Sequence, residues 1–131
     1  MIRSIFVLAT LLAASTAVAS PEKPTNSELK DWMTYLRSVS LPVTMDACPA
    51  VLPADAGYAD VARRWLESHG EEIKRGHDFA VAGSPKERDF EQYTTAMLED
   101  FKVKFLAEPA EVRLKMCQES LEALQKHDKG H

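Results

Sequence analysis

Histidine and carboxylate side chains are the groups of this chain that could bind a metal ion, and their spacing is unfavourable. The sequence has four histidines, at positions 69, 77, 127 and 131. His69 and His77 are eight residues apart, which on a helix separates them by about 12 Å along the axis, too far to share one ion. His127 and His131 lie at a terminus, where side chains are commonly disordered. We therefore expect no metal site and no cofactor.

The residue patterns of hydrolytic enzymes are also missing from the sequence. No Gly-x-Ser-x-Gly motif occurs to place a nucleophile beside a base. The acidic residues between Asp55 and Glu72 alternate with Arg63, Arg64, Lys74 and Arg75, a pattern typical of a solvated helix face with salt bridges. Methionines and aromatic residues fall in apolar stripes, where core packing is the ordinary role. We expect no enzymatic activity.

Two cysteines, Cys48 and Cys117, are the remaining candidates for chemistry. They are not arranged as Cys-x-x-Cys, which excludes the usual thiol-exchange and haem-attachment motifs. An even cysteine count in an exported protein favours a disulfide, with two buried thiols as the alternative. A bridge closing a loop of about 70 residues would stabilise the fold by about 4 kcal/mol in the chain-entropy model.

The first nineteen residues are typical of a cleavable signal peptide. Arg3 provides a positive charge, an apolar stretch follows, and Ala17-Val18-Ala19 offers small residues for cleavage. The apolar stretch has about ten residues, half of what a membrane-spanning helix needs. We expect residues 1–19 to be removed and residues 20–131 to form a single domain in the periplasm. The alternative is an N-terminal apolar core helix.

The net charge of the chain argues against two classes of binding partner. The formal net charge of the chain is −4, and it becomes −5 once the segment with Arg3 is removed. Nucleic-acid binding depends on Lys and Arg that neutralise phosphates, and an anionic membrane surface attracts the same residues. The acidic balance therefore argues against both nucleic acid and membrane as partners.

Apolar residues recur three and four positions apart through most of the mature chain, which predicts an all-α fold. The pattern predicts a small bundle of four main helices cross-linked by the disulfide. The second is either one long bent helix or two consecutive helices, because Gly70 and Gly76 interrupt it. A connector with up to one helical turn is expected at residues 40–54.

Capping residues and prolines predict where each helix begins and ends. Thr25 and Glu28 predict a capping box that opens the first helix, and Pro42 is expected to end it. Asp55 is a candidate cap for the second helix, which is expected to reach about Ala82. Gly83-Ser84-Pro85 then predicts a helix end followed by a third helix capped by Ser84, and Pro109 starts the last helix. The first helix carries a stripe expected to face the core, formed by Leu29, Trp32, Met33, Leu36 and Val39.

In size, export signal, helical pattern and its Cys48–Cys117 pair, the mature chain resembles the small helical periplasmic immunity and inhibitor proteins of Gram-negative antibacterial secretion systems. The resemblance implies a protein that neutralises a toxin effector by direct protein–protein contact. A helix face or loop that plugs the partner's active site is the expected mode. The glycine-bearing stretch 69–84 is the expected contact, and its candidate residues are His69, Glu72, His77, Asp78 and Phe79. The alternative is that these residues lie on the surface of a bent helix and have no role in binding.

Two other functions are compatible with the sequence. An acid-stress chaperone of the periplasm would lose its packing when carboxylates and histidines become protonated. A small metal or haem carrier would use the histidines and methionines discussed above. We rank both below the immunity or inhibitor function.

Overall fold

The structure is a computed structural model that describes residues 23–128. This part of the chain contains no β-strand, which confirms the expected all-α class, and no helix in it combines the length and apolar character that crossing a bilayer requires. The expected signal peptide and the side chains of His127 and His131 lie outside the described residues. The helices are α1 (Asn26–Ala47), η1 (Cys48–Ala50), η2 (Ala54–Ala56), α2 (Tyr58–Ser68), α3 (Gly70–Gly83), α4 (Phe90–Ala107) and α5 (Ala110–Asp128), where η marks a 3-10 helix.

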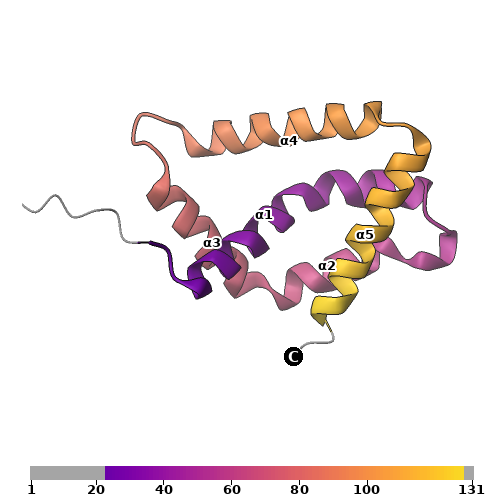
Figure 1. Cartoon of the computed structure of the whole chain (residues 1–131), viewed down its shortest axis with the longest axis horizontal. Coiled ribbons are helices and arrows are strands. Elements are labelled where there is room, and N and C mark those ends of the chain that lie inside the picture. The colour runs from indigo at the N-terminus through magenta and orange to yellow at the C-terminus, as the bar shows by residue number, and fades with distance from the viewer. Residues whose placement is uncertain (1–22, 129–131) are drawn as a thin grey trace, which may run out of the picture.

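Helix α1 runs through the middle of the fold. Figure 1 shows α4 along one side of α1, and α2 with α3 along the other side. Helix α5 crosses near the C-terminal end of α1 and packs against α2 (Figure 1). The contact between α1 and α3 is the most extensive, whereas α4 touches α1 over a much smaller area. Helices α1 and α3 are therefore the main packed pair of the fold, and α4 contacts this pair less extensively.

The start of α1 is as predicted, but its end is not. Thr25 and Glu28 form the expected capping box, each side chain accepting a hydrogen bond from the other residue's backbone N–H. The prediction that Pro42 ends the helix is wrong, since α1 continues to Ala47. A proline inside a helix costs about 3 kcal/mol because one hydrogen bond is lost. Leu41 and Val43 are both buried here, and at about 1.5–3 kcal/mol each their burial outweighs that cost.

The described residues contain five α-helices where four were predicted, because the expected second helix is divided in two. The division falls at His69, whose backbone φ of −111° and ψ of 16° leave the helical region. The carbonyl of Trp65 is contacted by the His69 backbone N–H at 3.0 Å, by its ring Nδ1 at 2.8 Å and by Ser68 Oγ at 3.1 Å. Such local side-chain bonds compete with regular helix geometry. Asp55 does not cap α2; Gly57 does, with the positive φ of 62° that favours glycine.

The boundary between α3 and α4 is also partly different from the prediction. Helix α3 ends at Gly83 as expected, but the next helix begins at Phe90 and not at Pro85. Asp89 provides the cap, since its carboxylate accepts a hydrogen bond from the backbone N–H of Gln92 at 3.1 Å. The hydroxyl of Ser84 makes no such bond. Residues 84–89 therefore form a non-helical connection beside the start of α4.

The predicted disulfide between Cys48 and Cys117 is present and lies at the centre of the core. It joins η1 to α5, and both cysteines are fully buried. The buried residues around it come from four of the α-helices and the connector: Leu41, Val43, Leu52, Tyr58, Ala62, Trp65, Phe105 and Leu124. One covalent bond therefore ties the end of α1 to the last helix inside the apolar cluster.

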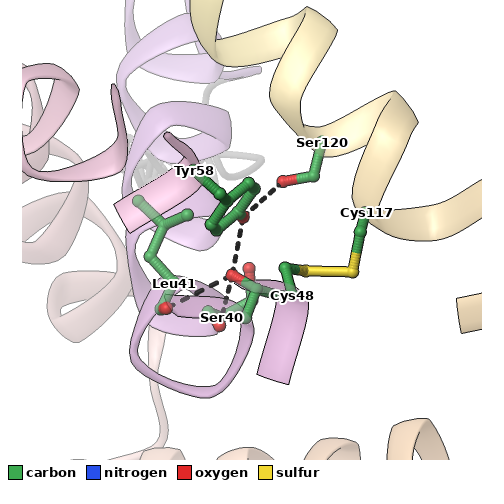
Figure 2. Close-up of a disulfide and its surroundings, with 7 residues drawn as sticks. Ser40, Leu41, Cys48, Tyr58, Cys117 and Ser120 are labelled. Carbon is green, nitrogen blue, oxygen red and sulfur yellow. Dashed lines mark hydrogen bonds between the residues drawn. A yellow bond between two sulfur atoms is a disulfide. The ribbon is translucent and has the colours of Figure 1, made fainter. Parts of the chain in front are cut away.

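A hydrogen-bond network accompanies the disulfide (Figure 2). The hydroxyl of Tyr58 donates to Thr44 Oγ1 at 2.8 Å and lies 2.7 Å from Ser120 Oγ. Thr44 in turn donates to the carbonyl oxygen of Leu41 at 3.2 Å. The network joins α1, α2 and α5. It also gives hydrogen-bond partners to buried polar groups that would destabilise the fold without them.

Helices α1 and α3 cross at Gly76. A Cβ atom at this position would lie 2.1 Å from the carbonyl oxygen of Asp31 and 2.7 Å from Cβ of Tyr35. Only a residue without a side chain allows the two backbones to approach so closely. Next to the crossing, Arg75 donates to both carboxylate oxygens of Asp31, at 2.8 and 3.3 Å. Hydrogen bonding to Asp31 raises the pKa of the Arg75 guanidinium above its ordinary value.

Replacing Gly76 with alanine tests this crossing. Because the new methyl group meets backbone atoms, the helices must separate, and we expect G76A to lower the free energy of unfolding by about 2–3 kcal/mol in urea titrations. Gly70 is the matched control, since a Cβ there meets nothing within 4 Å. G70A should be neutral or stabilising by up to about 1 kcal/mol. Equal stabilities of the two variants would contradict the close crossing.

The disulfide gives a second prediction. The bond spans 69 positions of sequence, so the double variant C48A/C117A should lose about 4 kcal/mol of unfolding free energy, most of it through the freer unfolded chain. Urea denaturation followed by circular dichroism measures the loss. The wild-type protein in reductant should match the double variant. An unchanged midpoint in both samples would show that the bond is not a main constraint on the fold.

Candidate functional site

An apolar groove lies between α1, α3 and α4 and has a volume of about 320 Å³. Volumes of about 300–1,000 Å³ are typical of sites that hold small ligands or inserted side chains. The lining comes from all three helices and from the connection 84–89. The groove therefore lies between α4 on one side and α1 with α3 on the other.

The α1 wall of the groove is formed by Trp32, Leu36 and Val39. These residues belong to the apolar stripe predicted for the first helix, and all three are half-buried. The face of α1 that α3 covers instead carries Asp31 and Tyr35, which are 7 % and 8 % exposed. Because the polar residue Asp31 is satisfied by Arg75, α1 can bury it and leave its more apolar face open to the groove.

The α4 wall carries Tyr93 and Met97, and α3 contributes Phe79 opposite them. Tyr93 and Met97 are 44 % and 45 % exposed, although they are large and apolar. Side chains of this kind in one hollow are typical of binding surfaces, because aromatic rings and the flexible methionine thioether fit many apolar partners.

An aromatic cluster closes the groove where α4 begins. The ring of His77 meets Tyr35 and Phe90 edge to face, with centroid distances of 5.5 and 5.4 Å. Nε2 of His77 also lies 3.5 Å from the carboxylate of Glu91. Edge-to-face ring pairs add about 0.5–1.5 kcal/mol beyond burial. His77 therefore links α3 to the first turn of α4 and contacts two residues that line the groove, Tyr35 and Phe90.

Two polar groups of the connection 84–89 line the groove as well. The guanidinium of Arg88 stacks over the ring of Tyr93, 4.4 Å from its centroid. The Ser84 hydroxyl is inaccessible to solvent and has no hydrogen-bond partner among the described atoms. No acidic residue lines the groove. The site is thus an apolar hollow with one cation and one unpaired donor at its rim.

The expected contact residues are distributed unevenly around this groove. Phe79 lines it, His77 does not but contacts the lining residues Tyr35 and Phe90, and Asp78 is exposed beside His77, 3.3 Å from its Nδ1. His69 is only 6 % exposed and stacks on Trp65 in the joint between α2 and α3, so it has little surface to offer a partner. Glu72 is half-buried and is not part of the groove lining.

Of the residues that line the groove only Phe79 was anticipated as a site residue, and the apolar residues Trp32, Tyr93 and Met97 are among those that were not. Their signal was present in the sequence, since both α1 and α4 carry more apolar residues than one buried face requires. Periodicity shows that a helix has an apolar face, but it does not show whether another helix covers that face.

A second hollow lies between the C-terminal part of α1 and α4. It has a similar volume of about 340 Å³, but its lining includes the charged residues Asp46, Glu99 and Lys102 and no aromatic residue. Charged groups on both walls disfavour an apolar occupant. The aromatic groove is therefore the stronger candidate.

The described residues contain no group of three histidine, cysteine or carboxylate side chains close enough to hold a metal ion. The groove offers apolar contacts, the cation of Arg88 and several hydroxyl groups, a set suited to holding a ligand. Comparison with models of protein families, with curated proteins and with solved structures finds no match for this chain.

Proposed function

We propose that this protein is a non-catalytic binding protein whose groove between α1, α3 and α4 receives an apolar element of a protein partner. The observation that supports this function is the open aromatic groove itself, in which Tyr93 and Met97 remain exposed beside the half-buried Trp32, in a small domain with a well-packed core elsewhere. Apolar residues gathered in a hollow are a cost to a soluble protein unless they bind something.

The partner we propose is a toxin effector, which the protein inhibits as an immunity protein. The resemblance in size, helical pattern and single disulfide supports this class of function. A structural disulfide suits a protein of an oxidising compartment, and the signal-peptide pattern of residues 1–19 suits export to the periplasm. The acidic chain is complementary to a basic partner, because opposite charge speeds association.

The shape of the site changes the expected mode of inhibition. A convex helix face would plug the active site of the toxin, whereas a groove holds an element that protrudes from the toxin. Arg88 and Ser84 are polar residues among the otherwise mostly apolar lining. A buried apolar centre with a polar rim is the usual anatomy of a protein–protein interface. We therefore propose that the toxin inserts a side chain or chain end into the groove.

Substitution of Met97 with aspartate tests this function. An unpaired carboxylate in the groove must be desolvated when the partner enters, so M97D should weaken capture of the partner at least about hundredfold, equivalent to about 2.7 kcal/mol. The assay immobilises the processed protein, recovers the bound protein from periplasm that contains the product of the neighbouring gene, and measures whether the toxin activity of that protein falls.

Val103 provides the matched control because it lies on the same helix, is 66 % exposed and does not line either hollow. V103D should capture the partner as the wild-type protein does. Circular dichroism confirms that both variants are folded. Equal loss of capture in both variants, or capture by M97D at the wild-type level, would contradict the proposed role of the groove.

A further inference from the structure

The polar residues at one end of the groove indicate which chemical group the bound element presents to it. We infer that the groove recognises the free C-terminus of a polypeptide, with the last apolar side chain in the hollow and the terminal carboxylate on Arg88. This inference rests on the proposed function, since it names the part of the partner that enters the same groove. Three features of the structure support it.

The first feature is the state of Arg88. Its guanidinium carbon lies over the ring of Tyr93, 4.4 Å from the centroid, and its N–H groups make no hydrogen bond to another described residue. No carboxylate of the described chain lies within ion-pair distance of Arg88, although Glu87 and Asp89 adjoin it in sequence. A stacked guanidinium is held in place and can donate two parallel hydrogen bonds to a carboxylate.

The second feature is the unpaired hydroxyl of Ser84. It is inaccessible to water and has no partner in the described structure, a state that costs about 1–3 kcal/mol in a native protein. Ser84 and Arg88 belong to one short connection, and the backbone N–H of Arg88 donates to the carbonyl of Pro85 at 3.0 Å, which turns the chain between them. Ser84 is also a lining residue of the groove, so a bound carboxylate or peptide carbonyl would accept its hydrogen bond once a small side-chain shift opens the hydroxyl to the groove.

The third feature is the size and chemistry of the hollow. Its 320 Å³ is bounded by Trp32, Phe79 and Met97 and suits one or two apolar side chains better than the two chains of a phospholipid. A phosphate group is commonly bound by a cluster of arginines, whereas this groove has one. A single carboxylate next to an apolar side chain, as at a chain end, matches both charge and volume.

The test uses two dipeptides that differ only in the terminal charge, N-acetyl-Leu-Phe as the free acid and as the C-terminal amide. The protein has two tryptophans, so the indole N–H signals in the NMR spectrum separate the groove residue Trp32 from the core residue Trp65. The acid should shift the Trp32 signal at a concentration at least about tenfold lower than the amide, about 1.4 kcal/mol. The Trp65 signal should not move.

Two variants test whether the preference for the free acid over the amide depends on Arg88. R88Q should bind the acid and the amide equally, at the level of the amide on the wild-type protein. R64Q is the matched control, since Arg64 is exposed on α2 and outside the groove, and it should keep the tenfold preference. Unchanged preference in R88Q would overturn the inference.

Two other outcomes would also overturn it and remain distinct from failure of the proposed function. Equal binding of acid and amide by the wild-type protein at Trp32 would show an apolar groove without carboxylate recognition, and the M97D capture result would still stand. Decanoate that binds in an Arg88-dependent way while neither dipeptide binds would assign the site to a free amphiphile. Failure of the proposed function would appear instead as capture that is indifferent to M97D.

Discussion

The covalent bond between Cys48 and Cys117 is the constraint on which the arrangement of the other elements depends. It fixes α5 against the end of α1, and only a two-residue connection separates α5 from α4. Phe105, near the end of α4, is buried in the same core. The C-terminal end of α4 is therefore anchored through the disulfide, while His77 and Phe90 hold its other end. Between these two anchors α4 spans α1 and α3, and the groove lies beneath it.

The close crossing of α1 and α3 explains why the groove is apolar. Gly76 allows the two backbones to meet, and Arg75 neutralises the carboxylate that this contact buries. A polar residue thus occupies the packed face of α1, and its Trp32 stripe is left without a covering helix. The same stripe would be a normal core face if α4 packed directly on it. A binding surface arises here because apolar side chains that a core would have covered are kept open.

The sequence was sufficient to predict the helical class, the disulfide, the capping box at Thr25 and the end of α3, because each depends on local chemistry or on cysteine pairing. It was not sufficient for Pro42 or Pro85, where tertiary burial and the Asp89 cap decide the boundary. The groove could not be predicted either, because periodicity does not show which apolar face remains uncovered. Of the predicted contact residues, only Phe79 lines the groove, whereas His69 is held in a buried joint.

The central claim, that the open face of α4 is where a protein partner binds, is tested most directly by photocrosslinking in the cell that exports the protein. The photoreactive residue p-benzoylphenylalanine would replace Tyr93 in the groove or Val103 outside it, both exposed on α4. We predict that ultraviolet light yields one discrete adduct with the toxin effector from position 93 and none from position 103. An adduct with that protein from position 103, or its absence from position 93, would contradict the account.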